Sequence, residues 1–210
     1  MFFLLYIVHH ENSMIYRDMK PENTGFDSDG VLKIFDFGQA REVDPRTKDD
    51  DGNYQLTGLC GSRRYMAPEN LLKIPYGLNV DVYSFGVMLW EMMTLEKSFA
   101  GMDSERHRVE VAIGGSRPDI PHSLPLNVKL LIKECWSPKP YERPAFSNIV
   151  SRLMAELKSE AYSEVTRKKF DKPKARAVMN TLHFSSNAIS VSSGSIGSDS
   201  SSSLQSFSRK

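Results

Sequence analysis

Acidic and amide residues gather in one short stretch near the start of the chain. Asp18 and Asn23 stand five positions apart, and Asp36 follows a short run of strand-forming residues. Isolated aspartates and asparagines most often cap turns or helices. Their oxygen atoms can also accept a proton or hold a hard cation such as Mg²⁺. The choice between these interpretations depends on whether further motifs follow in a fixed order.

Three motifs do follow in such an order. D-x-x-x-x-N spans residues 18–23, D-F-G spans 36–38 and A-P-E spans 67–69. Because each specified position matches by chance about one time in fifteen or twenty, the ordered set is not a coincidence. On these motifs, residues 3–157 resemble the eukaryotic protein kinases. Lys20 resembles the serine/threonine-specific pattern, and C-W-x-x-x-P-x-x-R-P-x-F over residues 135–146 resembles the tyrosine-kinase-like branch.

The resemblance implies a chemical role for four residues. Asp18 accepts or orients the proton of the substrate hydroxyl, and Lys20 meets the transferring phosphate as a point charge. Asn23 and Asp36 bind Mg²⁺, which keeps its other positions for the phosphates of ATP and for water. The implied function is ATP- and Mg²⁺-dependent phosphoryl transfer to serine or threonine hydroxyls of a protein substrate.

Residues 37–68 resemble an activation segment, which switches such a site on or off. Arg17 would pair with a phosphate on Thr57, and an upstream activating kinase is the implied source of that phosphate. Ser62 stands where the family usually has a threonine that contacts the catalytic loop, so it is expected to position the substrate. Tyr16 replaces the usual histidine, and its hydroxyl needs a partner.

Three more charged residues are expected to hold the architecture together. Asp81 would accept hydrogen bonds from the backbone of the catalytic loop, which we define as residues 16–23. Glu69 of the A-P-E motif should form a buried ion pair with Arg143.

The expected fold is mainly α, of the α+β class: the helical C-terminal lobe of a protein kinase with a small β-hairpin. Strands are expected over residues 24–26 and 31–35, because the D-S-D-G turn between them favours a hairpin. Asp27 and Asp29 are interpreted as turn residues. The apolar run over residues 79–94 predicts a buried central helix. Further helices are expected over residues 127–136 and 145–161.

A complete protein kinase also carries a glycine-rich loop and a strand lysine before its catalytic loop. No G-x-G-x-x-G occurs in this sequence, and only seventeen residues precede Asp18. The V-A-I run at residues 111–113 is followed by glycine rather than lysine, so we expect it to be part of a helix. We therefore expect a C-terminal lobe whose N-terminal partner lobe is missing. The apolar residues 1–8 are expected to be the end of a truncated core helix. The chain in isolation is expected to be a poor catalyst. The competing hypotheses are a non-catalytic kinase-lobe interaction module and a disordered adaptor that works through its serine-rich end.

Composition limits the partners and defines three regions. Lys+Arg 27 against Asp+Glu 26 gives a net charge of +1, which favours neither nucleic acid nor an anionic membrane as a partner. Two cysteines among 210 residues provide no disulfide framework, so a reducing, cytoplasmic location is expected. Residues 1–160 are predicted to be the kinase lobe and 161–184 a basic linker. Residues 185–210 are predicted to be a disordered tail, since serine fills 13 of the 24 positions from 185 to 208.

Overall fold

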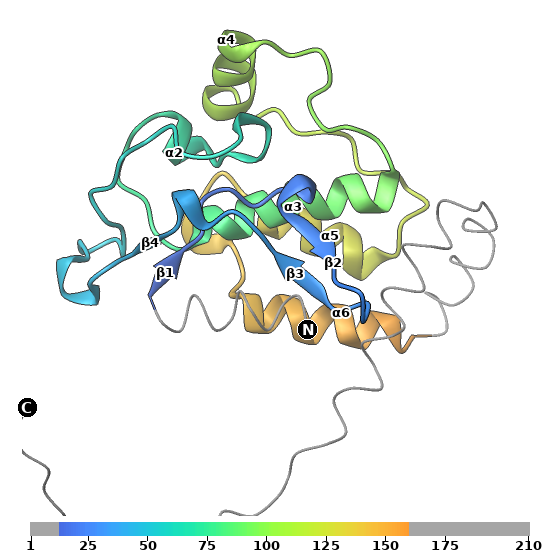
Figure 1. The fold of residues 1–210 in the computed structure, drawn as a ribbon. Helices are drawn as coiled ribbons and strands as arrows, with labels where there is room; N and C mark the ends of the chain where they lie inside the picture. The colour runs from blue at the N-terminus through green and yellow to red at the C-terminus, as the bar shows by residue number, and fades with distance from the viewer. Residues whose placement is uncertain (1–12, 160–210) are drawn as a thin grey trace, which may run out of the picture.

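The computed structural model describes residues 13–159 (Figure 1). The predictions of a truncated helix end at residues 1–8, a basic linker at 161–184 and a disordered tail at 185–210 lie outside the described residues.

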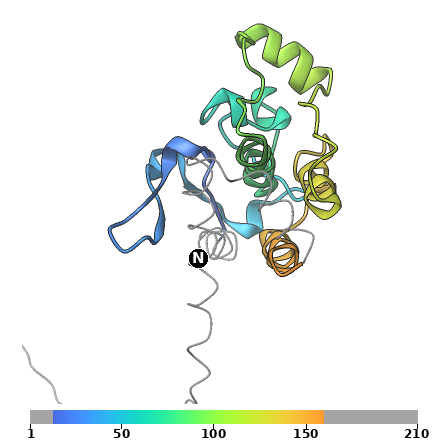
Figure 2. The same ribbon diagram turned by 90° about the vertical axis from the view of Figure 1, so that its right-hand side faces the viewer.

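A buried helix, α3 (Asn79–Thr94), forms the centre of the molecule. Its first three turns are buried almost all round, which is why the sequence is apolar on every face. Helices α5 (Leu126–Cys135) and α6 (Phe146–Leu157) complete the core, and Figure 2 views these helices nearly end-on. Gly86 lets α3 approach α5 closely, since an added Cβ would lie 2.7 Å from the Cβ of Cys135. The predicted central helix is confirmed at its stated bounds.

Shorter helices connect these elements to the rest of the chain. Helix α2 (Pro68–Leu71) precedes α3, and α4 (Ser104–His107) runs on into a π-helical turn, η5 (Arg108–Ile113). The V-A-I run thus lies in a helix, as predicted. The 3₁₀ turns are η1 (Pro21–Asn23), η2 (Phe37–Gln39), η3 (Pro45–Thr47), η4 (Arg63–Tyr65) and η6 (Pro140–Glu142).

Two small antiparallel sheets flank the helices. Strand β2 (Thr24–Phe26) pairs with β3 (Leu32–Ile34), and the carboxylate of Asp27 accepts the backbone N–H groups of Asp29 and Val31 within the turn. The predicted hairpin is confirmed. The second sheet, β1 (Met14–Ile15) with β4 (Arg41–Glu42), was not predicted. Each of its strands has two residues, too few for a periodic pattern to reveal.

The helices predicted over residues 127–136 and 145–161 are present with shifted bounds, as α5 and α6. The last helix was expected to run to residue 161, but α6 ends at Leu157. Both the backbone N–H and the hydroxyl of Ser159 donate to the carbonyl oxygen of Glu156, at 2.9 and 2.7 Å. Serine bonds of this kind compete with the helical pattern and end it.

From residue 13 to residue 159, no helix combines the length and the apolar character that crossing a lipid bilayer requires.

Candidate active site

The catalytic loop is suspended from the start of α3 by one buried carboxylate. Asp81 is fully buried and accepts the backbone N–H groups of Tyr16 and Arg17, each at 2.8 Å. Buried carboxylates need donors of this kind, and the loop provides them. The predicted contact between Asp81 and the loop backbone is confirmed.

Asp18 lies at the centre of a network of donors. Its carboxylate accepts Lys20 Nζ at 2.7 Å, the backbone N–H of Ser62 at 2.7 Å and Asn23 Nδ2 at 2.9 Å. Burial alone would raise the pKa of Asp18, but the hydrogen bonds from Lys20, Ser62 and Asn23 together hold the pKa below its usual value. The carboxylate is therefore ionised at neutral pH and fixed in direction.

Lys20 connects the catalytic loop to the activation segment. Its Nζ contacts Asp18 and also donates to Ser62 Oγ at 2.8 Å. Ser62 thus meets the loop twice, through its backbone N–H and its hydroxyl. The expectation that Ser62 contacts the catalytic loop agrees with this geometry, and two charged side chains and one hydroxyl converge on one point.

The hairpin returns the chain to the catalytic loop. Asn23 Nδ2 donates to the backbone oxygen of Asp18 at 2.9 Å, and the N–H of Phe35 donates to the backbone oxygen of Asn23 at 2.9 Å. Asp36 follows directly, in a left-handed backbone conformation with φ of 53°. Aspartate tolerates this conformation better than most residues, and the Asp36 carboxylate accepts the N–H of Gly38 at 3.1 Å.

Tyr16 lies between these groups. Burial, and then the carboxylates of Asp18 and Asp36 among others, raise the pKa of Tyr16 to about 12, partly offset by a hydrogen bond from Asn23. Its hydroxyl donates to the backbone oxygen of Phe35. The hydroxyl of Tyr16 thus finds its partner in the residue directly before Asp36.

Asn23 and Asp36 form a donor set that fits Mg²⁺. Asn23 uses its amide nitrogen to hold Asp18, which leaves its side-chain oxygen as the atom for a cation. Asp36 is exposed and adds a carboxylate. Mg²⁺ prefers such hard oxygen ligands, and it commonly takes only one or two from the protein.

Arg17 faces the activation segment rather than the catalytic centre. Its guanidinium donates to the backbone oxygen of Gln39 at 2.6 Å and to the hydroxyl of Tyr76 at 3.2 Å, and it lies 3.5 Å from Thr57 Oγ1. Tyr76 in turn donates to the backbone oxygen of Thr57 at 2.7 Å. Arg17 and Thr57 are thus brought together, whereas Tyr76 was missed because its place beside them is set only by the tertiary fold.

Gly61 is a second residue that the sequence analysis missed. Its φ is +94°, and an added Cβ would lie 2.0 Å from the backbone oxygen of Arg17. Only glycine allows the segment to lie this close to the catalytic loop. The sequence offers a glycine beside Ser62 but no sign that another backbone passes there.

The ion pair between Glu69 and Arg143 is present, as predicted. Two nitrogens of the Arg143 guanidinium contact the two carboxylate oxygens of Glu69 at 2.5 and 3.0 Å, and Arg143 also donates to the backbone oxygen of Ser137 at 3.0 Å. Both side chains are almost fully buried. This pair fixes the end of the activation segment to the helical body.

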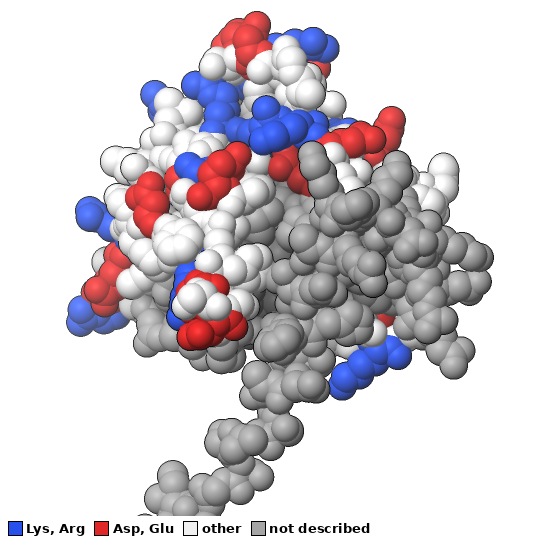
Figure 3. Space-filling view, turned by 45° about the vertical axis from the view of Figure 1, so that its right-hand side comes forward, with Lys and Arg blue, Asp and Glu red and all other residues white. Residues whose placement is uncertain are grey.

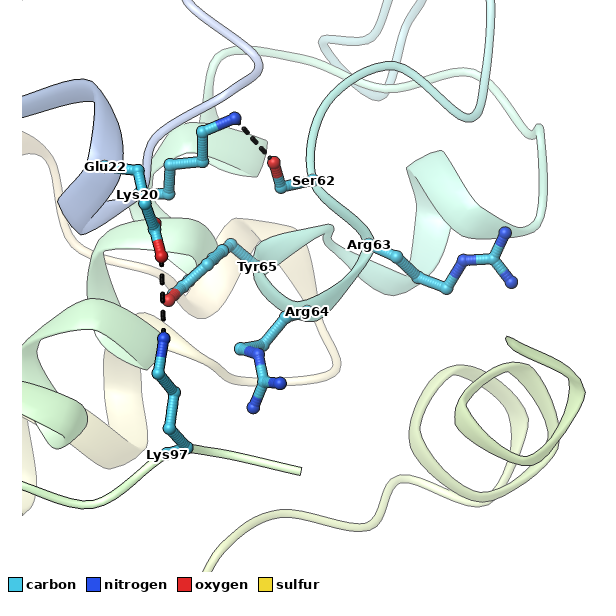
Figure 4. Close-up of a pocket in the computed structure, with 7 residues that line it drawn as sticks. All are labelled: Lys20, Glu22, Ser62, Arg63, Arg64, Tyr65 and Lys97. Atoms are coloured by element: carbon cyan, nitrogen blue, oxygen red, sulfur yellow. Dashed lines mark hydrogen bonds and ion pairs between the residues drawn. The ribbon is translucent and has the colours of Figure 1, made fainter. Parts of the chain in front are cut away.

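A cavity of about 390 Å³ opens beside Lys20 and Ser62 (Figure 4). Arg63 and Arg64 also line it, and Lys97 forms an ion pair with Glu22 across it at 3.5 Å. Lys20, which lines this cavity, contacts the carboxylate of Asp18 at 2.7 Å.

A carboxylate fixed by a lysine, with an amide and a second carboxylate close by, is an arrangement suited to phosphoryl transfer. Residues 4–154 match the family model described as the protein kinase domain. The chain belongs to the protein kinase family.

Curated relatives agree with this assignment. The chain is 34% identical over 149 residues to a dual specificity protein kinase of Dictyostelium discoideum, covering 70% of this chain and 22% of that protein. It is 38% identical over 144 residues to a serine/threonine/tyrosine-protein kinase of Arabidopsis thaliana, covering 69% and 35%. It is 35% identical over 145 residues to mitogen-activated protein kinase kinase kinase 12 of Rattus norvegicus, covering 69% and 15%. The chain therefore spans about a third or less of the length of these relatives.

Proposed function

We propose that this site transfers the terminal phosphoryl group of ATP to serine or threonine hydroxyls of a protein substrate. The single observation that carries the proposal is the convergence of Lys20, Asn23 and the Ser62 backbone N–H on the carboxylate of Asp18. Three donors fix the direction of this carboxylate, and a base that must face one hydroxyl needs its direction fixed.

Each residue then has a defined task. Asp18 orients the incoming hydroxyl and accepts its proton, while the ammonium group of Lys20 meets the negative charge of the phosphate. Asn23 and Asp36 would hold Mg²⁺, which neutralises the charge of the phosphates when bound. Ser62 keeps Lys20 in place through the 2.8 Å contact between its hydroxyl and Nζ.

The preference for serine and threonine is proposed from Lys20, which follows the serine/threonine-specific pattern. The printed names of two relatives, a dual specificity kinase and a serine/threonine/tyrosine kinase, make tyrosine the alternative acceptor to test. Acid hydrolysis of a radiolabelled protein substrate, followed by separation of phosphoserine, phosphothreonine and phosphotyrosine, separates the two.

The experiment combines transfer with a matched pair of variants. The full chain is incubated with radiolabelled ATP, Mg²⁺ and a protein substrate mixture, and label on serine and threonine is counted. Asp18→Asn should lower the transfer rate by about 100-fold or more, because it removes the base. Asp29→Asn, in the exposed hairpin turn, should transfer like the wild type. Transfer that survives Asp18→Asn contradicts the proposal, and no transfer by the wild type favours the interaction-module hypothesis.

We also propose that phosphate on Thr57 stabilises the activation segment. Thr57 is exposed, and Arg17 lies 3.5 Å from its hydroxyl, so a phosphate there would find a guanidinium partner. Mass spectrometry of active protein should find Thr57 phosphorylated, and Arg17→Ala should remove the gain in activity that this phosphate brings. Active protein in which Thr57 is always unmodified contradicts the proposal.

A further inference from the structure

A second cavity adjoins the candidate active site and shares two arginines with it. This cavity of about 360 Å³ is lined by Arg63 and Arg64 on one side and by His107 on the other. Arg63 follows Ser62 directly, so the cavity begins one residue away from the point where Lys20 and Asp18 meet the segment. Figure 4 shows the Arg63 side chain pointing away from Lys20.

The positive charge of this cavity is only partly neutralised. Within residues 13–159, the guanidinium of Arg63 makes no hydrogen bond or ion pair, although its neighbour Arg64 donates to the backbone oxygen of Ser98. Asp103 is the acidic residue of the lining, and its carboxylate already accepts the backbone N–H of Arg106 at 2.8 Å. Figure 3 shows Lys and Arg atoms gathered across this face beneath the projecting α4.

His107 adds an unsatisfied polar group to the same cavity. Its side chain is buried, and neither ring nitrogen has a hydrogen-bond partner. The ring is held edge-on to Phe99, with centroids 4.9 Å apart. Burial, and then the charges of Arg63, Arg64 and Arg117, lower the pKa of His107 to about 4. The imidazole is therefore neutral at pH 7 and able to donate one hydrogen bond.

We infer that the cavity formed by Arg63, Arg64 and His107 receives an acidic side chain of the protein substrate, next to the hydroxyl that is phosphorylated. The inference rests on the proposed function. The guanidinium of Arg63 is exposed and can form a charge-assisted hydrogen bond with an anionic oxygen. The imidazole of His107 is buried without an acceptor, and an anionic oxygen that reached its ring nitrogen would supply one. The anion is a carboxylate of aspartate or glutamate, or the phosphate of a residue that is already phosphorylated.

The test measures peptide binding, which does not depend on transfer. Four fluorescent peptides each carry one central serine and differ only in the residues within three positions of that serine. These flanking residues are glutamate in the first peptide, phosphoserine in the second, glutamine in the third and lysine in the fourth. Their dissociation constants for the full chain are measured by fluorescence anisotropy. We expect the glutamate peptide to bind about fivefold more tightly than the glutamine peptide, since the contact is a partly exposed ion pair. The phosphoserine peptide should bind more tightly still, because phosphate carries more charge, and the lysine peptide should bind most weakly.

Two variants assign the preference to the cavity. Arg63→Ala should bring the glutamate and glutamine peptides to equal affinity. Arg46→Ala removes the same charge from a distant exposed arginine and should leave the preference unchanged. Equal binding of the glutamate and glutamine peptides by the wild type, including no binding of either, overturns the inference. So does a preference that survives Arg63→Ala.

The outcomes also separate this inference from the proposed function. If the chain prefers acidic peptides but transfers no phosphate, the result supports the inference about the cavity and contradicts the proposed kinase activity. If the chain binds the glutamate and glutamine peptides equally and phosphorylates their serine at equal rates, the result supports the proposed kinase activity. The same result overturns the inference about the cavity.

Discussion

The catalytic loop and the activation segment meet at Asp18 but are held in different ways. Four of the eight residues in 16–23 are buried, and Asp81 fixes the loop backbone from inside the core. In residues 37–62, by contrast, Val43 and Tyr54 are the buried residues. The segment is held by long-range hydrogen bonds rather than by burial. These are side-chain bonds from Arg17, Tyr76 and Lys20, and backbone bonds such as those of β4 with β1 and of Tyr54 with Tyr76.

This difference separates the residues proposed to carry the chemistry from those proposed to control it. Asp18, the proposed base, and Lys20 lie on a loop whose position is set by the folded core. Ser62 and Arg63 lie on a segment that has few buried contacts, and such segments open at low free-energy cost. The structure thus combines a fixed centre with an adjustable neighbour, an arrangement suited to a switch.

The largest loss of stability is expected where the segment ends. Arg143→Ala leaves the buried carboxylate of Glu69 without its partner and should lower the free energy of unfolding by about 3–5 kcal/mol. Denaturant unfolding followed by circular dichroism measures this. Arg106→Ala, which breaks an exposed ion pair with Glu110, is the control and should cost far less. An equal loss of unfolding free energy in the two variants would mean that the buried ion pair does not stabilise the fold more than an exposed one.

The loop should depend on Asp81 more than the segment depends on any one carboxylate. Asp81→Asn replaces one of two acceptors by a donor, so a buried N–H of Tyr16 or Arg17 loses its partner. We expect a loss of about 2–3 kcal/mol in the free energy of unfolding. Asp44→Asn changes an exposed cap of η3 in the segment and should have a much smaller effect. A larger loss for Asp44→Asn than for Asp81→Asn would reverse the comparison.

Acid should weaken the fold through His107. The pKa of this histidine is about 4 in the folded chain and about 6.5 when unfolded, so the unfolded chain takes up the proton first as pH falls. Stability should therefore decrease between pH 6.5 and 4. Between pH 7 and pH 4.5 the wild type should lose about 2 kcal/mol more than His107→Gln. His122→Gln, at an exposed histidine, should behave like the wild type.

The smallest loss of stability, but a clear loss of activity, is expected at the contact between the two regions. In Gly61→Ala the new Cβ would meet the backbone oxygen of Arg17, and the weakly held segment is the part that moves. We expect a loss of about 1–2 kcal/mol in the free energy of unfolding and about a tenfold loss of transfer rate. Gly30→Ala is a matched control, because Gly30 also has a positive φ of 74° but open space around it. Similar transfer rates in the two variants would show that the close approach does not position Ser62.

Much of the fixed region could be predicted from sequence because its signals are local. The apolar run that defines α3, the turn between β2 and β3 and the order of the motifs all lie within short stretches. Two of the predicted long-range contacts, of Asp81 with the loop and of Glu69 with Arg143, depended on the family resemblance, since they join residues 64 to 74 positions apart.

The adjustable region could not be predicted in the same way. The pairing of β1 with β4, the approach of Gly61 to Arg17 and the burial of His107 beside Arg63 depend on where distant backbones pass. No periodicity encodes such distances, because each contact involves one or two residues. The same holds for Tyr76, which is fully buried. Only the tertiary fold brings its hydroxyl within hydrogen-bond distance of Arg17 and Thr57.

We propose that Asp36, at the border of the two regions, holds Mg²⁺ and nucleotide beside Asp18. Calorimetric titration of the full chain with ATP, with and without Mg²⁺, tests it most directly, using Asp36→Asn and the turn variant Asp29→Asn. We expect ATP to bind only with Mg²⁺, Asp36→Asn to weaken this binding by about tenfold or more, and Asp29→Asn to leave it unchanged. The proposal would be contradicted by equal ATP binding with and without Mg²⁺, by an unchanged affinity for ATP in Asp36→Asn, or by no ATP binding at all.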